Sequence, residues 1–271
     1  MLQGHDLAFG YGATEVLRGV SIDVAADGFL GILGPNGSGK TTLLRVLAGT
    51  IRPSRGRVTL DGVEIRSISR QLLARRMAVV PQETRLSFDF TALEVVLMGR
   101  YPHLGRFEIE GPADLAMARD ALTATGTADF ADRPFTTLSG GEKQRVIIAS
   151  ALAQIAAPGS DPSPGFLLLD EPTVALDLAY QLEIAHLLQT LQHQRQVAIV
   201  VSTHDLNFAA AFCRSLVLLK QGRVLAAGPT ADVLTPELIR ELYGVRADVR
   251  LHAEAGHLVV VPIAREGDAR R

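Results

Sequence analysis

The chain has 271 residues, of which 47% are hydrophobic and 21% are charged, and its net charge is −2. This length fits one large domain or one domain with a subdomain, and the apolar content can bury a core without cross-links. A pI near 6.4 argues against nucleic acid as a partner, because phosphate-backbone binders carry a basic surface. The N-terminus lacks the basic and apolar regions of a signal peptide. The lone Cys213 is expected to be buried, and no apolar run approaches the ~20 residues needed to cross a bilayer.

The first third of the chain predicts short strands separated by turns. The expected strands are residues 7–11, 17–24, 29–33, 56–60, 63–65 and 77–80. The Asp61-Gly62 pair favours a tight hairpin between the fourth and fifth of them. Residues 69–76 predict a short polar helix before the sixth.

A glycine-rich segment follows the strand at 29–33 and opens a helical pattern. It consists of Gly34, Pro35, Asn36, Gly37, Ser38, Gly39, Lys40 and Thr41, which is a complete G-x-x-x-x-G-K-[ST] phosphate loop. The glycines let several backbone N–H groups face one point beside the positive end of a helix. Lys40 would reach the β and γ phosphates, the Thr41 hydroxyl would bind Mg²⁺, and Thr42 completes the expected nucleotide site. The segment predicts binding of a nucleoside triphosphate.

Helices replace strands in the middle of the chain. Thr91 and Glu94 form a capping-box pattern at the start of a helix that ends at Met98. Two more helices are expected at 113–124 and 140–153, without a strand between them. The pattern predicts a helical insertion in an α/β domain. The expected boundaries are 1–82 and 154–245 for the core, 83–153 for the insertion and 246–271 for a C-terminal extension.

The α/β pattern resumes after a Pro/Gly/Ser-rich loop at 156–165. The strand at 166–169 delivers two adjacent carboxylates, Asp170 and Glu171. Asp170 suits the Mg²⁺ shell, and Glu171 is placed to orient or deprotonate a water that attacks the γ-phosphate. The alternative, a cap for the next helix, does not account for the buried strand.

The remaining elements continue this alternation to the end of the chain. They are a helix at 178–194, a strand at 197–201, a hairpin of 216–219 and 224–227, a helix at 236–242, two strands within 245–263 and a polar tail at 264–271. Continuous apolar strands are typical of a parallel sheet that is covered on both faces.

A third motif stands at the start of the helix at 140–153. It comprises Leu138, Ser139, Gly140, Gly141 and Glu142. A Ser-Gly-Gly turn at a helix N-terminus offers a hydroxyl, N–H groups and a dipole to a second anion. With these motifs, the sequence resembles the ABC-transporter ATPases, whose LSGGQ-type signature is written here as LSGGE.

This resemblance extends from residue 2 to about residue 261 and implies a fold and an assembly. The fold is a P-loop, RecA-like α/β core with an N-terminal antiparallel β subdomain and an inserted α-helical subdomain. The assembly is a homodimer in which each ATP lies between one chain's phosphate loop and the other chain's signature.

The resemblance also implies roles for four further residues. Gln82 matches the Q-loop glutamine that contacts Mg²⁺ and the attacking water. His204 matches the H-loop histidine that contacts the γ-phosphate and supports Glu171. Asp177 matches the D-loop, although Val174 stands where the family usually has a small polar residue. Tyr11 lies where the family stacks an aromatic ring on adenine. The alternative for His204 is a purely structural histidine, and the alternative for Tyr11 is an ordinary aromatic residue of a strand.

A finer resemblance links residues 94–104, 177–181 and 241–245 to ATPases of importers for iron–siderophores, haem and cobalamin. It implies an ATP-hydrolysing subunit at the cytoplasmic face of the inner membrane, attached through a permease. A periplasmic or lipid-anchored substrate-binding protein would act indirectly. The alternative is a soluble ABC ATPase that acts on a protein scaffold, such as iron–sulfur cluster assembly.

A short apolar segment after the helix at 91–98 is the candidate permease contact. Tyr101, Pro102 and Leu104 are expected in a surface loop, for which local packing is the alternative reading. The neighbouring His103 could suggest a metal ligand, but no Cys, His or carboxylate stands at ligand spacing from it. A surface or interface role is therefore favoured for His103.

Overall fold

A computed structural model describes residues 1–84, 88–155, 164–174 and 176–265. The chain divides into two compact units, one of Met1–Glu64 with Val200–Arg271 and one of Ile65–Ile199. The boundaries expected from the sequence, 1–82 and 154–245 for the core and 83–153 for the insertion, do not coincide with these units. Those boundaries stay predictions. The predicted loop at 156–165 lies mostly outside the described residues, as do Ala175 and the end of the predicted tail.

The N-terminal half of the first unit is an antiparallel sheet in the order β2-β1-β4-β5. Its strands are β1 (Leu2–Tyr11), β2 (Thr14–Val24), β4 (Arg55–Leu60) and β5 (Val63–Glu64). Asp61 and Gly62 have φ angles of 52° and 81°, so they form the expected tight turn. β1 begins five residues earlier than predicted, because Gly4 weakens the apolar alternation of its first half.

The second sheet of this unit has the order β10-β9-β3-β8. Its strands are β3 (Phe29–Leu33), β8 (Ala198–Thr203), which begins at the end of the second unit, β9 (Ser215–Lys220) and β10 (Arg223–Pro229). Every residue of β3 is buried, and β3 pairs with β9 in parallel. The helices of the unit are α1 (Lys40–Leu47), α7 (Leu206–Phe212), α8 (Thr230–Val233) and α9 (Pro236–Tyr243). Cys213 is buried as expected, and this burial raises the pKa of its thiol.

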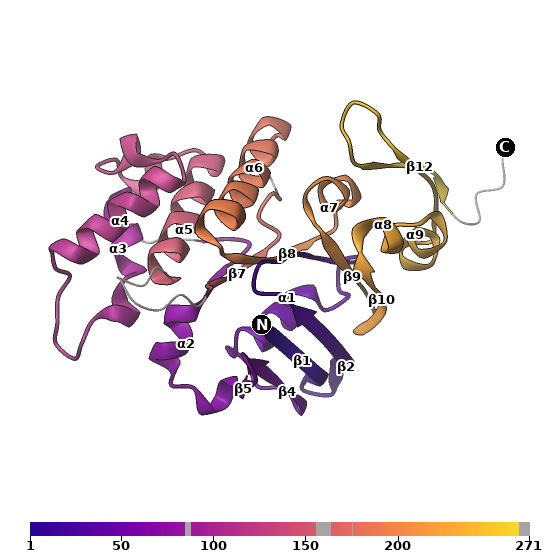
Figure 1. The fold of residues 1–271 in the computed structure, drawn as a ribbon, viewed down its shortest axis with the longest axis horizontal. Coiled ribbons are helices and arrows are strands. Elements are labelled where there is room, and N and C mark those ends of the chain that lie inside the picture. The colour runs from indigo at the N-terminus through magenta and orange to yellow at the C-terminus, as the bar shows by residue number, and fades with distance from the viewer. Residues whose placement is uncertain (85–87, 156–163, 175, 266–271) are drawn as a thin grey trace. The chain divides into compact units, whose positions relative to one another are not determined.

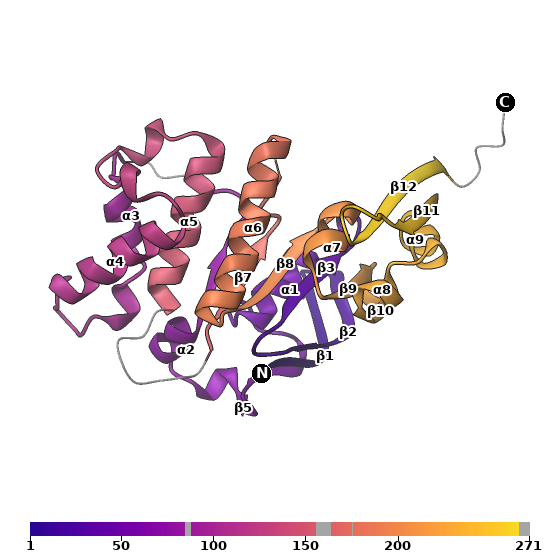
Figure 2. The same ribbon diagram turned by 45° about the horizontal axis from the view of Figure 1, so that its top comes forward.

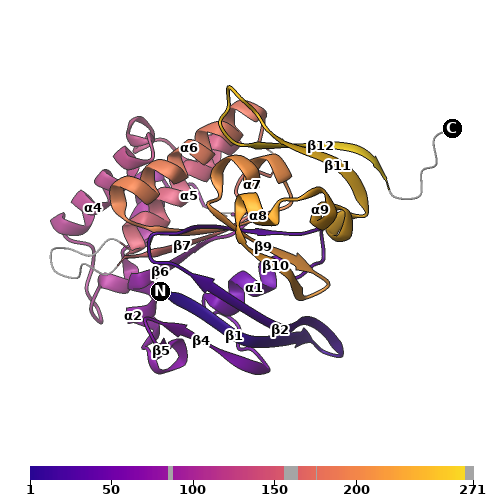
Figure 3. The same ribbon diagram turned by 45° about the vertical axis from the view of Figure 1, so that its right-hand side comes forward.

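A two-stranded antiparallel sheet closes the first unit (Figure 3). Its strands are β11 (Val245–Leu251) and β12 (Leu258–Arg265). The prediction of a polar tail from residue 264 is wrong at its start, since Ala264 and Arg265 pair with Arg246 and Val245. Helices α7 and α8 were not predicted. The segment of α7 is apolar at every position except Asn207, so it shows no helical period, and α8 has only four residues.

The second unit combines a parallel strand pair with helices. β6 (Met77–Val80) and β7 (Phe166–Asp170) pair in register from Met77 opposite Phe166 to Val80 opposite Leu169. The helices are α2 (Arg70–Arg76), α3 (Ala92–Met98), α4 (Pro112–Ala124), α5 (Gly140–Ile155) and α6 (Leu178–Arg195), with short 3₁₀ turns at η1 (Ile65–Ser67), η2 (Tyr101–His103), η3 (Ala128–Phe130) and η4 (Phe135–Thr137).

The helices of this unit pack around α5, which contacts α3, α4 and α6 (Figures 1 and 2). The capping box of α3 is confirmed, since Thr91 accepts a hydrogen bond from the Glu94 N–H and Glu94 accepts one from Thr91. Arg195 of α6 forms a two-point ion pair with Asp120 of α4. None of the helices in the described part of the chain is long and apolar enough to cross a membrane.

Candidate functional site

The phosphate loop follows β3, and its last two residues, Lys40 and Thr41, begin α1. Gly34 must lack a side chain, because a Cβ there would lie 2.3 Å from the carbonyl oxygen of Leu219 in β9. Gly37 and Gly39 have φ angles of 78° and 105°, which glycine adopts without strain. The backbone therefore curls tightly between the strand and the helix, and the packing of β9 sets its starting point.

The start of α1 is suited to an anion. Gly39 caps the helix without a side-chain hydrogen bond, and the first turn contains no acidic residue, so its N–H groups and dipole are not offset by a local negative charge. Lys40 is only 5% exposed and donates to the Gly34 carbonyl at 2.9 Å. The buried Ser38 hydroxyl has no hydrogen-bond partner among the described residues. A buried cation, an unused hydroxyl and uncapped amides fit a phosphate group.

Two other predicted site residues belong to the same unit. His204 directly follows β8, which neighbours β3 in the sheet, and it is exposed. Tyr11 ends β1 with its side chain about half exposed and edge-on to Phe9, with ring centroids 4.9 Å apart. The exposed face of the Tyr11 ring is available for stacking.

In the second unit, Gln82, Asp170 and Glu171 come to one edge of the β6–β7 pair. Val80 is paired with Leu169, and the strands run in parallel, so the residues that follow them emerge at the same edge. Asp170 is 7% exposed. Glu171 has a φ of 47°, a left-handed conformation that is uncommon outside glycine and turns the chain sharply after Asp170.

The alternative role of this pair as a helix cap is not observed. α6 is capped by Asp177, whose carboxylate accepts a hydrogen bond from the Tyr180 N–H at 3.1 Å. Asp177 therefore has a local structural role in addition to the D-loop role that its position predicts.

The signature residues form the N-terminus of α5. Ser139 donates its N–H to the Glu142 carboxylate at 2.7 Å, and the Ser139 hydroxyl accepts from the Glu142 N–H at 3.3 Å. The hydrogen bond from Ser139, together with nearby Arg133 and Arg145, lowers the pKa of Glu142 below its ordinary value. One of the N–H groups expected to face a second anion, that of Ser139, is therefore already bound to the Glu142 carboxylate.

The two signature glycines have different neighbours. A Cβ on Gly141 would lie 2.4 Å from the ring of Tyr180, whereas the nearest atom to a Cβ on Gly140 would be 3.5 Å away on Leu176. The sequence did not reveal the contact between Tyr180 and Gly141, since the two residues are 39 positions apart. Packing against Tyr180 is therefore sufficient to explain why residue 141 is a glycine.

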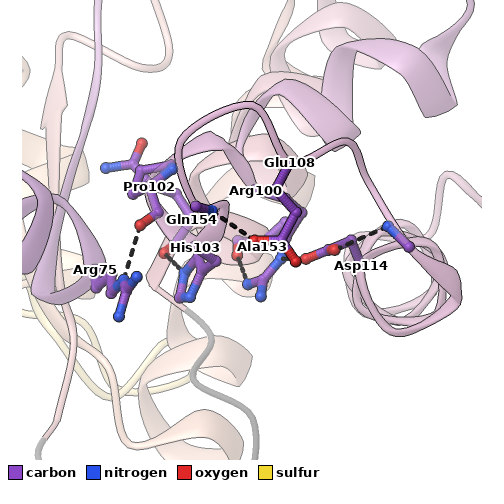
Figure 4. Close-up of polar contacts among 10 residues, drawn as sticks. Arg75, Arg100, Pro102, His103, Glu108, Asp114, Ala153 and Gln154 are labelled. Atoms are coloured by element: carbon purple, nitrogen blue, oxygen red, sulfur yellow. Dashed lines mark hydrogen bonds and ion pairs between the residues drawn. The ribbon is translucent and has the colours of Figure 1, made fainter.

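The candidate permease segment begins with a buried arginine (Figure 4). Arg100 is 2% exposed; it donates to Asp114 at 3.0 Å and to the Ala153 carbonyl at 2.6 Å. His103 donates through Nε2 to the Gln154 carbonyl at 2.7 Å, and burial lowers the pKa of this imidazole. No cluster of metal ligands occurs in the described residues.

The same segment is a 3₁₀ turn, η2, and not an open loop. Arg75 donates to the Pro102 carbonyl at 2.8 Å, and Gln71 donates to the Leu104 carbonyl at 3.1 Å. Pro102 and Leu104 are half-buried, while Tyr101 is 57% exposed. Local packing thus explains most of the segment, and Tyr101 is its exposed side chain.

Known proteins resemble this chain over nearly its whole length. The hemin import ATP-binding protein HmuV of Bordetella pertussis is 41% identical over 261 residues, 96% of this chain and 98% of that protein. HmuV of Gloeobacter violaceus is 44% identical over 248 residues, 92% of this chain and 89% of that protein. The cobalamin import ATP-binding protein BtuD of Halobacterium salinarum is 41% identical over 250 residues, 92% of this chain and 60% of that protein.

Solved structures agree with this likeness. A metal-chelate type ABC transporter in an inward-facing conformation superposes with a TM-score of 0.82 at 31% identity, covering 97% of this chain and 96% of that chain. A dimeric bacterial ABC transporter cassette superposes with a TM-score of 0.70 at 29% identity, covering 85% and 99%. The family model described as ABC transporter matches residues 17–174. That match exceeds half of the chain, and the relatives span almost all of it. The chain therefore belongs to the ABC transporter family, as an ATP-binding subunit.

Proposed function

We propose that this chain hydrolyses ATP to power the uptake of a metal-chelate nutrient, such as haem, cobalamin or a ferric siderophore, through a partner permease. The observation that carries the proposal is the near-full-length likeness to ATP-binding proteins of hemin and cobalamin import. The uncapped, cation-lined start of α1 supplies the phosphate site that such a subunit requires. The scaffold-ATPase alternative has no comparable support.

The phosphate loop holds the triphosphate in this proposal. Backbone amides at 34–39 and the Lys40 ammonium bind the β and γ phosphates, with the Thr41 and Thr42 side chains beside them. The Tyr11 ring stacks on the adenine. Thr41, Gln82 and Asp170 offer the oxygen atoms that Mg²⁺ prefers, and the ion neutralises phosphate charge when it is bound. Because Mg²⁺ keeps several waters and binds phosphates, it does not require an all-carboxylate protein cage.

Hydrolysis then requires a positioned water. Glu171 accepts a proton from that water, whose oxygen bonds to the γ-phosphorus while the bond to the bridging oxygen of ADP breaks, so the products are ADP and inorganic phosphate. His204 contacts the γ-phosphate and supports Glu171. The left-handed backbone at Glu171 is a feature often found where a side chain must be aimed.

Two chains complete the sites in this proposal. Ser139, Gly140 and Gly141 of one chain would close on the ATP of the other, next to the D-loop residue Asp177. Tyr101, the exposed residue of η2, contacts the permease. The subunit then lies at the cytoplasmic face of the cell membrane, and a substrate-binding protein delivers the chelate from the other side.

Reconstitution tests the proposal. The chain and its permease are placed in liposomes with ATP inside and the substrate-binding protein outside, and uptake of haem, cobalamin and a ferric siderophore is measured beside phosphate release. We expect uptake of one chelate, and we expect Glu171→Gln to bind ATP with unchanged affinity but to lose about 10²–10⁴ in turnover. Phosphate release without uptake of any of the three would refute chelate import and leave the ATPase assignment. Normal turnover by Glu171→Gln would remove Glu171 from its role.

A further inference from the structure

The C-terminal hairpin is fastened to the helix that follows His204. Asn207, in the first turn of α7, accepts a hydrogen bond at Oδ1 from the Val260 N–H at 2.8 Å. Its Nδ2 donates to the Val260 carbonyl at 3.2 Å. Figure 3 shows α7 beside β12. Among the described strands, β12 pairs only with β11, so the Asn207 side-chain amide takes the place of a neighbouring strand at the other edge of β12.

The segment between β8 and Asn207 is itself a hydrogen-bonded turn. The Asp205 carboxylate accepts from the N–H groups of Asn207 at 2.8 Å and Phe208 at 3.0 Å. The Asp205 N–H donates to the Thr203 hydroxyl at 3.0 Å. His204 lies inside this turn. Because the hydrogen bonds restrict the backbone between His204 and Asn207, a shift of Asn207 also moves the His204 backbone.

A second contact reaches His204 from the same end of the chain. The Tyr243 hydroxyl at the last residue of α9 lies 3.5 Å from the His204 carbonyl oxygen. This bond is long and weak compared with the Asn207 pair. Since α9 leads directly into β11, both contacts connect His204 to the C-terminal residues.

We infer that Asn207 is a positioning residue for ATP hydrolysis. Its side chain is held by the β11–β12 hairpin, and it in turn holds the backbone of His204 in place. The inference rests on the proposed role of His204 at the γ-phosphate. Small displacements of a catalytic group have large effects on rate and small effects on binding, because the transition state demands tighter geometry than the bound substrate. The Val260 backbone thus supports the position of His204 through the Asn207 side chain.

Steady-state hydrolysis and equilibrium ATP binding test this inference in the full chain. Asn207→Ala removes both hydrogen bonds, and the isosteric Asn207→Asp keeps the acceptor but loses the donor. We expect kcat to fall about tenfold for Asn207→Ala and at least as much for Asn207→Asp, whose second carboxylate oxygen would face the Val260 carbonyl oxygen, while the ATP dissociation constant stays within about twofold. Val261→Thr, at an exposed position beside Val260, is the matched control with unchanged kcat.

A double mutant separates positioning from general stability. If Asn207 acts through His204, then Asn207→Ala should cost no further activity in a His204→Ala background. Equal fractional losses in both backgrounds, or an unchanged kcat for Asn207→Ala, would overturn the inference. Full activity of His204→Ala alone would instead refute the role of His204, so the two failures are distinguishable.

Discussion

Gly140 and Gly141 show how two identical neighbours can be needed for different reasons. The space next to Gly140 is open to an ordinary contact, whereas Gly141 is covered by the Tyr180 ring. A sequence motif treats both as loop glycines that expose the backbone. In this structure, Gly141 is a packing residue that lets α6 approach α5.

The pair makes a residue-scale prediction about stability. Gly141→Ala should lower the free energy of unfolding by about 1–3 kcal/mol, because a Cβ overlaps the ring and the helices must separate. Gly140→Ala should be neutral or should stabilise slightly, since alanine restricts the unfolded chain and meets no clash. Chemical denaturation of both variants measures the difference. Adding Tyr180→Ala to Gly141→Ala should remove the clash term, and equal stability of the two single variants would contradict the assignment.

At the scale of elements, Arg100 joins three parts of the second unit. It follows α3, it is paired with Asp114 in the first turn of α4, and it donates to the end of α5. Although burial alone would raise it, the pKa of Asp114 is lowered by the Gly111 N–H and by Arg100. An arginine among the most completely buried side chains thus sets the position of η2 (Figure 4).

Removal of this guanidinium should leave Asp114 charged, partly buried and without its ion-pair partner. We expect Arg100→Met to destabilise the protein by about 3–5 kcal/mol, which is typical when one partner of a buried ion pair is lost. Tyr101→Glu, at the adjacent exposed position, is the control and should change stability by less than about 0.5 kcal/mol. Urea denaturation of both proteins decides the matter. A small loss for Arg100→Met would mean that water replaces the guanidinium at Asp114.

At the scale of the whole molecule, the phosphate loop and the signature lie in different compact units of one chain. Two separate phosphate-binding motifs in one chain can serve the same ATP if two chains meet head to tail, which is the arrangement expected from family membership. In the proposed dimer, each composite site would combine Lys40 of one chain with Ser139 of the other.

Mixing two inactive variants tests this arrangement. Lys40→Ala should weaken ATP binding, and Ser139→Arg should bind ATP but fail to close because of the bulky side chain. A mixed dimer contains one site with both lesions and one with neither, so phosphate release should reappear on mixing, at up to about one quarter of the wild-type rate if the two sites act independently. No gain over the separate variants would exclude a head-to-tail dimer with independent sites.

The sequence by itself determined what short-range physics controls. The Asp61-Gly62 turn, the Thr91 capping box, the buried runs of β3 and β7 and the phosphate loop all follow from residues within a few positions of one another. Such patterns bias the backbone locally before any tertiary contact forms. They also located the phosphate loop and the Asp170–Glu171 pair, whereas the roles of Tyr11, Gln82 and His204 came from the family resemblance.

Only the tertiary structure decided which distant residues support that site. Tyr180 against Gly141, Asp114 against Arg100 and Val260 against Asn207 are partners separated by 39, 14 and 53 positions, and no local pattern specifies them. The early start of β1 and the strand character of Ala264 were likewise set by pairing with distant strands. Side-chain packing and strand pairing are contacts in space, so the fold had to bring these residues together before their roles could be recognised.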